Sequence, residues 1–432
     1  MDSWQSHDRL SELPDSLILE ILSLLDTRYA VRTTFLSKRW RDLWTIVPRL
    51  KFEYEHPDFI CGVVAKWRGV KLVRFYLSLD YWSPTRDIDP WLLFAVEKQV
   101  EELHVGWLSR IFDITYFPPQ CLYSCSSLTE LDLSYCWFKI EGTVHWNRLK
   151  SLCIFVNHLG DDAMNKLLLG APRLEEMSLF IYEIDEDLCI RSISLKNLKI
   201  DCKDRKAILR IWAPNLLTLE IGENVIGGGD CLFYVPSLTE AFFTYVYDHH
   251  PSSPLPLESF YQILRSICHV KEVTFSQLHI ESLLDMKKKD KDLQFPNVEF
   301  LIQEYWDASE YHLLDLLGLL EMFPELKIFI FHQHKDLYIF NPIVEMTLPR
   351  PSLLHLNTIE ITWSAEDPSI IQSIEFLLQN APFLHKMVFH LVYDTDNHEL
   401  FLMVEEKVRS LPRSSPTVEL IIIEHVVDES KS

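Results

Sequence analysis

The sequence lacks any long uninterrupted apolar run, and its first residues lack an apolar core. No apolar stretch approaches the ~18 residues that a membrane-spanning helix needs. The opening MDSWQSHDRL mixes charged, polar and apolar residues, so it does not have the pattern of a signal peptide. The sequence therefore predicts no membrane contact, and we expect the protein in the cytoplasm, the nucleus or both.

The cysteines lack the regularity of a disulfide framework or a zinc site. There are nine, an odd number at irregular spacing, which favours reduced thiols. Cys121 and Cys125 are the closest pair, but they lack C-x-x-C spacing and no second pair of ligands follows. We interpret them as packing residues, and we expect no metal and no cofactor.

The sequence also lacks the common catalytic motifs. It contains no G-x-S-x-G, no H-E-x-x-H and no G-x-x-x-x-G-K-[ST]. Acidic pairs such as Glu101-Glu102 and Glu175-Glu176 are adjacent, so on a strand their side chains point to opposite faces and form no acid–base pair. The sequence therefore predicts a protein that is not an enzyme.

Positive charge is scarce outside the N-terminal segment. The chain has 41 Lys and Arg against 63 Asp and Glu, a net charge of −22. Residues 1–50 hold seven of each sign, so the whole excess, 56 acids over 34 bases, lies in residues 51–432. A body this acidic repels phosphate backbones, and we expect no binding to nucleic acid.

What the sequence does have begins with a short N-terminal helical segment. Leu13-Pro14 opens a helix, and Asp15 complements the positive end of its dipole. A second helix is predicted over Tyr29 to Thr34, and Ser37 is expected to cap a third. Apolar side chains at helical spacing form a stripe on the first helix (Leu17, Ile21, Leu24, Leu25) and one face of the third (Trp40, Leu43, Trp44).

The order of these residues resembles the F-box family. The family pattern of Leu-Pro, an Ile-Leu-x-x-Leu helix and a basic, Trp-containing helix is found at Leu13-Pro14, Ile21–Leu25 and Leu36–Trp44. The sequence LSKRWRDLW is similar to the plant branch with a leucine-rich-repeat body. The resemblance implies docking onto a Skp1-like adaptor and, through it, a cullin, with adaptor-binding residues Leu13, Pro14, Leu17, Ile21, Leu25 and Trp40.

The residues alone leave open how these side chains divide between the domain's own core and an adaptor. A helical cap that only seals the body would show the same periodicity. The cluster Lys38-Arg39-x-Arg41 has two interpretations as well. It is either a solvated helix face or a rim that steers an acidic adaptor, and both can hold.

Beyond residue 52 the dominant feature is a repeat of apolar-x-x-apolar-x-apolar. Successive copies start 21 to 32 residues apart, and several have a Pro shortly before the start. Because the last positions alternate with period 2, each copy predicts a short strand with its apolar face inward. The thirteen starts are Leu72, Val100, Leu128, Leu149, Leu174, Leu195, Leu216, Leu238, Val270, Val298, Leu326, Leu356 and Leu384.

The repeats predict an α/β fold in which a three-helix F-box precedes a leucine-rich-repeat solenoid of short parallel strands. The return segments between strands are helical or irregular. Helical spacing is present at Trp91–Val100, Asp161–Leu169, Ser259–Ile267, Tyr311–Met322 and Ile370–Leu378. Three segments are predicted as loops: the Pro-rich His249–Pro256, the charged Met286–Asp292 and the Gly-rich Gly227–Asp230.

The C-terminal part resembles the FBD module that ends many plant F-box proteins. Leu377-Leu378-Gln379-Asn380-Ala381 and the following Lys386-Met387 carry this resemblance. A helix from Glu399 to Leu411 and a strand from Val418 to Ile423 complete it. We therefore expect an F-box at 1–52, leucine-rich repeats at 53–350, an FBD-like module or cap at 351–424 and a tail at 425–432.

The resemblance implies a substrate-recognition subunit of an SCF-type ubiquitin ligase. The F-box binds the adaptor, and the strand face of the repeats binds a client protein. Two alternatives stay open, a small-molecule receptor of the F-box type and a scaffold outside any ligase. The acidic body disfavours an anionic ligand, although a neutral ligand is compatible with it.

Overall fold

The computed structural model describes residues 13–79, 88–107, 116–136, 138–183, 187–202, 208–222, 225–226, 229, 231–244, 255–290, 293–305, 317–333, 353–364, 369–394 and 398–427. The chain divides into two compact units, Met1–Asp204 and Arg205–Ser432. Each unit combines a sheet of parallel strands with helices, as the sequence predicts for a leucine-rich-repeat fold.

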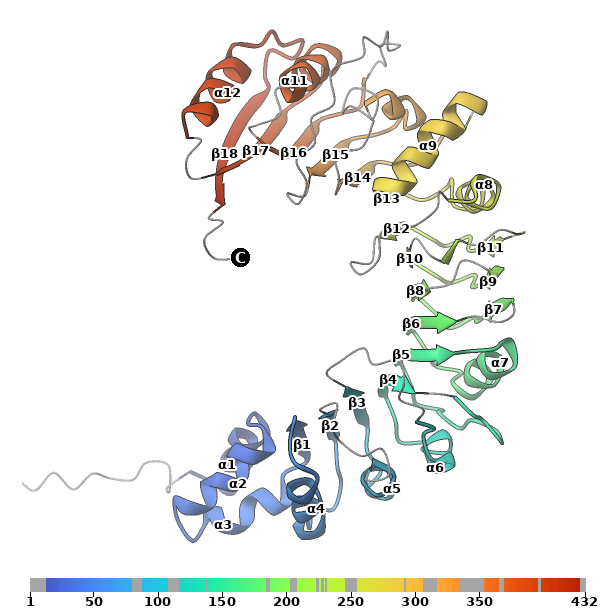
Figure 1. The fold of residues 1–432 in the computed structure, drawn as a ribbon, viewed down its shortest axis with the longest axis vertical. Coiled ribbons are helices and arrows are strands. Elements are labelled where there is room, and N and C mark those ends of the chain that lie inside the picture. Colours follow the sequence, from blue (N-terminus) through green and yellow to red (C-terminus); the bar gives the residue numbers. More distant parts are fainter. Residues whose placement is uncertain are drawn as a thin grey trace, which may run out of the picture. The chain divides into compact units, whose positions relative to one another are not determined.

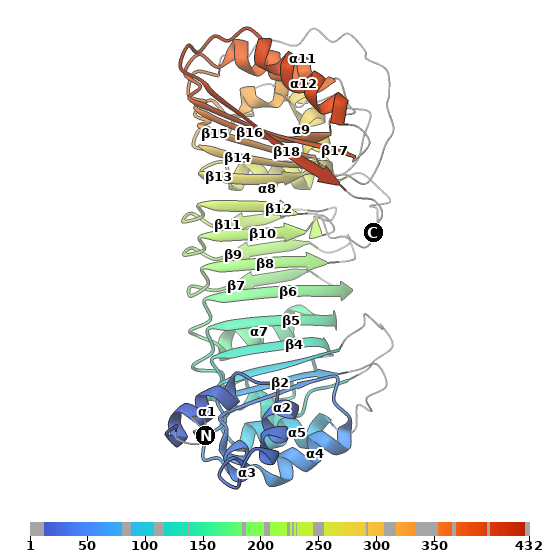
Figure 2. The ribbon, with the colours of Figure 1, turned by 90° about the vertical axis from the view of Figure 1, so that its left-hand side faces the viewer.

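The first unit is built on strands that lie in the order β1-β2-β3-β4-β5-β6-β8, and neighbouring strands run parallel (Figure 2). Helices α4–α7 lie on one side of this sheet (Figure 1). The elements are β1 (Arg49–Glu53), α4 (Pro57–Lys66), β2 (Arg74–Leu79), α5 (Ile88–Glu97), β3 (Glu102–Trp107), α6 (Gln120–Tyr123), β4 (Glu130–Cys136), β5 (Ser151–His158), α7 (Asp161–Gly170), β6 (Glu176–Glu183), β7 (Leu188–Arg191) and β8 (Asn197–Cys202).

The second unit has strands in the order β10-β12-β13-β14-β15-β16-β17-β18, again parallel. The short strands β9 (Leu209–Trp212) and β11 (Leu232–Tyr234) pair with each other. The other elements are β10 (Thr218–Gly222), β12 (Glu240–Thr244), α8 (Leu257–Ser266), β13 (Glu272–Ser276), α9 (Gln277–Lys289), β14 (Phe300–Tyr305), η5 (Leu319–Met322), β15 (Ile328–Gln333), β16 (Thr358–Ser364), α11 (Ser369–Asn380), β17 (Lys386–Asp394), α12 (His398–Ser410) and β18 (Glu419–Val427).

All thirteen predicted repeat starts are core residues. Each precedes the first residue of a strand by two positions, and none is more than 3% exposed. The inward positions of successive strands stand in register, for example Leu103 with Leu131 and Leu152 with Met177. The periodic pattern therefore identified the strands of the repeats and the side chains that hold them together.

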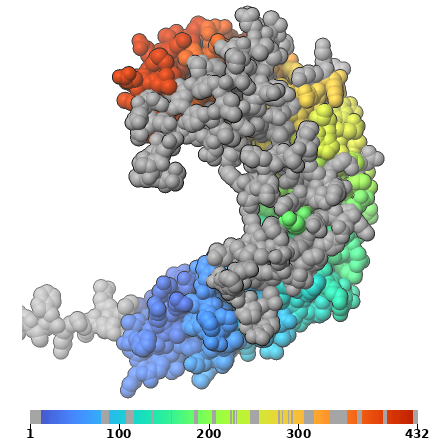
Figure 3. All heavy atoms as spheres, in the orientation of Figure 1, coloured from blue at the N-terminus to red at the C-terminus, as the bar shows by residue number. Residues whose placement is uncertain are grey.

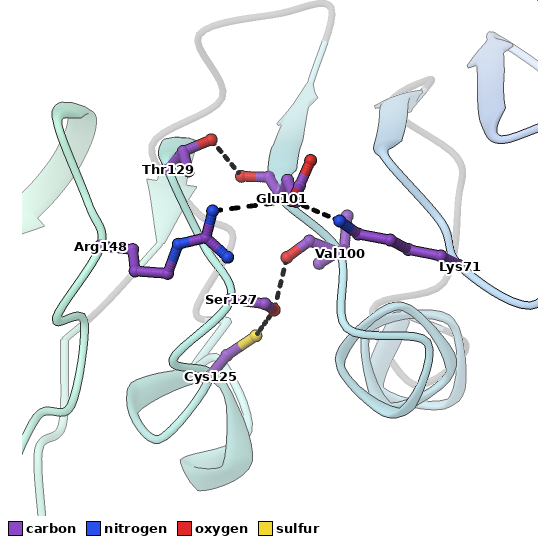
Figure 4. Close-up of polar contacts among 7 residues, drawn as sticks. All are labelled: Lys71, Val100, Glu101, Cys125, Ser127, Thr129 and Arg148. Carbon is purple, nitrogen blue, oxygen red and sulfur yellow. Dashed lines mark hydrogen bonds and ion pairs between the residues drawn. The ribbon is translucent and has the colours of Figure 1, made fainter.

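Successive repeats are joined by a recurring backbone contact. After eleven of the thirteen starts, the carbonyl of the next residue accepts two N–H groups from the following repeat: Glu101 O accepts from Thr129 N at 2.7 Å and from Glu130 N at 3.1 Å. Side chains add to this contact (Figure 4). Ser127 Oγ donates to Val100 O at 2.7 Å, and the Glu101 carboxylate lies 2.5 Å from Lys71 Nζ.

The N-terminal helices are α1 (Asp15–Ser23), α2 (Thr27–Arg32), η1 (Thr33–Phe35), α3 (Trp40–Leu43) and η2 (Trp44–Ile46). Among them, α2 packs against β1. At this end of the chain, the dark-blue N-terminal atoms lie directly against the lighter-blue atoms that follow them (Figure 3). Pro14 stands at the N-cap of α1 and Asp15 in its first turn, close to the prediction. The predicted face of Trp40, Leu43 and Trp44 is confirmed as buried.

Two predictions for these helices are wrong. The second helix begins at Thr27 rather than Tyr29 and passes into η1 at Thr33. Ser37 does not cap the third helix: α3 begins at Trp40, and the buried Ser37 hydroxyl has no hydrogen-bond partner. Residues 38 and 39 form a turn between Ser37 and the start of α3. The Ser37 side chain is therefore too far from the first N–H groups of α3 to cap them.

The helical return segments agree with the prediction at α5, α7, α8, α11 and α12. Of the segment predicted over Tyr311–Met322, the described part contains η5. Of the Pro-rich loop predicted over His249–Pro256, residues 249–254 lie outside the described residues. The loop predicted at Met286–Asp292 is wrong over residues 286–289, because α9 continues to Lys289, and residues 291–292 lie outside the described residues. Met286 is buried there, and Lys287 Nζ lies 2.7 Å from a Glu321 carboxylate oxygen.

Strands also continue across the expected domain boundaries. Strand β1 begins inside the expected F-box and pairs with β2, with Leu50 beside Phe75. At the other end, β16 pairs with β15, and β17 pairs with β18 over nine residues. Helix α12 packs on β17 and β18. The expected domain boundaries are therefore boundaries in the sequence only. Within each unit, the strands on either side of such a boundary are hydrogen-bonded to each other.

The core position of the repeat starts yields a prediction about stability. We expect Leu174→Ala to lower the free energy of unfolding of the first unit by about 2–5 kcal/mol, because a buried Leu leaves a cavity. Leu169→Ala is the matched control, since Leu169 on α7 is 84% exposed, and its effect should stay within about 0.5 kcal/mol. Urea unfolding followed by circular dichroism measures both. Equal effects would contradict the assignment of Leu174 to the core.

Candidate interaction surfaces

Helix α1 has one face in the core and another in solvent. Ile18 and Leu22 are fully buried, whereas Leu17, Ile21 and Leu24 are between 36% and 81% exposed. Residues three and four positions apart share a side of a helix, so the exposed three form one apolar face. Together with the exposed Pro14 we call these residues the α1 face (Pro14, Leu17, Ile21, Leu24).

The structure separates the six residues that the sequence assigned to adaptor binding. Pro14, Leu17 and Ile21 are exposed on the α1 face, and Leu13 and Leu25 are half-buried. Trp40 lies inside the helical core with 3% of its surface exposed. Whether any of the six contacts an adaptor stays a prediction, but their accessibility to a partner differs.

Two strongly exposed apolar residues were not among those six. Phe35, at the end of η1, and the adjacent Leu36 both project into solvent. The sequence Thr-Thr-Phe-Leu has no helical period that would separate an inward from an outward side, so the periodicity gave no signal for them. Exposed apolar side chains of this size are typical of contact surfaces when they occur in groups.

An ion pair connects α1 to the basic segment. Arg39 donates to Asp15 Oδ1 through Nε at 2.8 Å and through Nη2 at 2.5 Å. Arg39 therefore holds the start of α1 against the start of α3. Lys38 and Arg41 are exposed beside Arg39. Their exposure is compatible with both interpretations of the basic cluster, a solvated helix face and a rim that steers an acidic adaptor.

The helices also close the edge of the sheet. Lys51 N of β1 donates to Thr27 Oγ1 at 2.8 Å, and Lys51 Nζ lies 3.0 Å from Asp26 and 2.9 Å from Glu53. Hydrogen bonds to Glu53 and Asp26 raise the pKa of Lys51. An edge strand with unpaired N–H groups attracts other strands, and α2 satisfies part of this edge.

The strand face of the first unit carries a chain of paired polar and aromatic side chains. Lys51 Nζ lies 5.6 Å from the centre of the Tyr76 ring, and this ring stacks on His104 at 4.2 Å. His104 Nδ1 lies 2.8 Å from Asp132 Oδ2. Burial, followed by the nearby Asp132 carboxylate, raises the pKa of Cys153 to about 12. Charges of both signs are therefore matched along this face.

A second aromatic pair lies on the same face. Phe155 and Phe180 stack at 4.0 Å with their planes 8° apart, and Lys199 Nζ lies 5.7 Å from the Phe180 ring centre. Both rings are half-buried. Such a flat apolar surface beside a cation can contact a partner side chain without rearrangement.

The strand face of the second unit has a different composition. The six strands β10 to β16 of its sheet contain five glutamates and no Lys or Arg. Their outward positions also include Phe242, Ile302 and Ile330, each half-buried. This face is therefore apolar with acidic surroundings, whereas the charges on the first face are paired.

Within the described ranges no cluster of three or more metal-binding side chains is present. In the same part of the chain, no helix has both the length and the apolar character needed to span a membrane.

Two family profiles match the chain. The F-box domain matches residues 10–52, and the leucine-rich repeats of an FBD-associated F-box protein, At5g56370, match residues 88–232. The first match contains the whole α1 face. The second contains the strand-face pairs of Asp132 and Phe155.

The relatives include proteins that match over nearly the whole chain. FBD-associated F-box protein At5g22730 of Arabidopsis thaliana is 27% identical over 96% of this chain and 94% of its own length. F-box/FBD/LRR-repeat protein At5g56420 of the same plant is 25% identical over 96% and 98%. F-box protein At5g03100, also from Arabidopsis, is 30% identical over 54% of this chain and 75% of its own length. With these matches and its N-terminal helices and repeats, the chain belongs to the family of plant F-box proteins with leucine-rich repeats.

Proposed function

We propose that this protein is the substrate-recognition subunit of an SCF-type ubiquitin ligase. The α1 face binds a Skp1-like adaptor, which connects the protein to a cullin, and the strand faces of the repeats bind a client protein. The protein acts in the cytoplasm or nucleus, because nine cysteines at irregular spacing favour reduced thiols.

The observation that carries the proposal is the α1 face. A segment that matches the F-box domain leaves three large apolar side chains of one helix in solvent, while Ile18 and Leu22 fill its core. Burying a fully exposed Leu or Ile side chain contributes about 1.5–3 kcal/mol. Leu17, Ile21 and Leu24 are 36% to 81% exposed, so each offers a partner a part of this energy. The rest of the domain is anchored to β1 through Thr27 and Lys51, which leaves the α1 face available.

The proposed role needs no catalytic group in this chain. An adaptor and a client bound to one protein are held at a restricted distance, which converts an encounter between separate molecules into an effectively intramolecular one. Rigid connection matters for this effect. Arg39 connects α1 to the start of α3 through Asp15, and Lys51 of β1 connects the helical domain to the first repeats through Asp26.

A double substitution on the α1 face tests adaptor binding. We expect Leu17→Asp with Ile21→Asp to weaken capture of a Skp1-like adaptor by at least about a hundredfold, because two apolar contacts are lost and two charges are placed in the interface. Both residues are exposed, so far-UV circular dichroism should not change. Quantitative pull-down with purified adaptor measures the effect.

Leu169→Asp is the control for this experiment, because Leu169 is exposed on α7, away from the F-box. It should leave adaptor capture unchanged. Undiminished capture by the Leu17/Ile21 variant contradicts the assigned face. No capture by the unsubstituted protein supports the alternative of a scaffold outside any ligase.

Trp40 is predicted to act differently from the α1 face. Because Trp40 is enclosed in the core, we expect Trp40→Ala to cost about 3–5 kcal/mol of stability and to lower the melting temperature. Trp40→Phe should retain most of the melting temperature and the adaptor capture. Loss of capture by Trp40→Phe at an unchanged melting temperature would instead indicate direct contact with the adaptor.

A further inference from the structure

The strand face of the second unit has a regular arrangement of apolar and acidic side chains. Its central row consists of Phe242, Thr274, Ile302 and Ile330, which stand in register on four neighbouring strands. Five glutamates surround this row, and we call them the acidic frame (Glu220, Glu240, Glu272, Glu304, Glu360).

The register fixes where each glutamate lies. Glu220 pairs with Phe242 at one end of the central row, and Glu360 pairs with Ile330 at the other. Glu240 and Glu272 are paired with each other, two positions before Phe242 and Thr274 on the same strands. Glu304 lies two positions after Ile302 on β14, on the opposite side of the row.

Three members of the acidic frame have no ion pair with Lys or Arg among the described residues: Glu240, Glu272 and Glu304. At one end of the row, Glu360 Oε1 lies 3.2 Å from His390 Nε2. Burial and the neighbouring Glu240 raise the pKa of Glu272, and burial and Glu220 raise that of Glu304. Like charges gathered at a partly desolvated surface favour the arrival of a cation.

Thr274 provides a second, independent observation. It is on the outward side of β13, since Val273 and Phe275 point into the core, yet only 4% of it is exposed. Its hydroxyl is buried and has no hydrogen-bond partner. A buried hydroxyl without a partner is unfavourable, and this one lies in the middle of the central row, between Phe242 and Ile302.

The dimensions of the row suit a helix. From Glu220 to Glu360 the face spans five strand spacings, about 24 Å, which equals the length of a helix of about 16 residues. The flanking glutamates lie about 6.6 Å to either side, giving a width of about 13 Å, close to a helix diameter. The strand spacing of about 4.8 Å is also nearer to the helical pitch of 5.4 Å than to the repeat of an extended chain.

We propose that this face binds a cationic amphipathic helix of the client, with its apolar stripe on the central row and its Lys or Arg side chains against the acidic frame. This inference rests on the proposed function, because it names the kind of client segment that the repeats recognise. Phe242, Ile302 and Ile330 contact the stripe. On binding, the helix displaces the side chains beside Thr274, and one of its polar groups pairs with the Thr274 hydroxyl.

The test uses the full chain and a fluorescent synthetic peptide of about 16 residues, with Leu at every third or fourth position and Lys on both flanks. Fluorescence anisotropy measures its dissociation constant. We expect saturable binding that weakens with added salt. Three matched peptides serve as controls: one with Glu in place of Lys, one with the same composition scrambled, and one with a central Pro. None of the three should bind comparably.

The variant Glu240→Gln with Glu272→Gln removes two charges from the frame while keeping the side-chain size. It should weaken peptide binding about fivefold. Glu258→Gln is the matched control, since Glu258 is exposed on α8 and its loss should leave the affinity unchanged. Ile302→Asp should reduce binding more than about tenfold.

Each contrary outcome overturns the proposal. Equal binding of the scrambled peptide, or equal effects of the frame and control variants, means that only the overall negative charge attracts the peptide. Full binding of the Pro-containing peptide means that the occupant is extended. If a variant fails to fold, amide exchange of the unsubstituted protein decides: the peptide must protect β12–β15, and no protection there contradicts the assigned face.

Adaptor capture is measured in parallel. The Glu240/Glu272 variant should capture the adaptor as the unsubstituted protein does, and the Leu17/Ile21 variant should bind the peptide with unchanged affinity. Failure of peptide binding alone therefore rejects this inference and leaves the proposed function standing, and failure of adaptor capture alone does the reverse.

Discussion

The structure depends on one backbone contact that recurs from repeat to repeat. A carbonyl just after most repeat starts accepts two N–H groups from the next repeat, as Glu101 O does from Thr129 and Glu130. The start residue beside it is buried against its neighbours. A single repeat can satisfy neither requirement, because its carbonyl and its apolar side need the next repeat. Side chains such as Ser127 and Lys71 reinforce the contact but do not create it.

This constraint explains why the N-terminal helices are more than an appended module. The first strand of a stack has no preceding repeat, so its edge must be covered by something else. Thr27 and Asp26 of the F-box segment meet Lys51 of β1 and supply this cover. The interpretation as a cap and the interpretation as an adaptor-binding domain are therefore compatible. One side of the helical domain seals the sheet, and the α1 face remains in solvent.

The sequence predicted the strands well and the helical faces less well, for a physical reason. Period 2 assigns each strand residue to one of two sides, and burial of one side fixes the choice. On α1 five of the nine residues are apolar and they include adjacent pairs, so Ile18 and Leu22 compete with Leu17 and Ile21 for the core, and periodicity cannot rank them. The same limit hid β1, whose Leu50 and Phe52 follow the repeat pattern inside a segment already assigned to the F-box.

Folding of the chain does not determine which side chains occupy the outward strand positions. Inward residues are dictated by packing, whereas an outward residue can be of either charge without disturbing the register. In the first unit these positions hold matched pairs such as His104 with Asp132. In the second unit, strands β10 to β16 carry glutamates without a single Lys or Arg. Folding stability gives no reason for this accumulation, since like charges on one face repel. A basic partner gives such a reason, because its positive charges offset the repulsion between the glutamates when it binds.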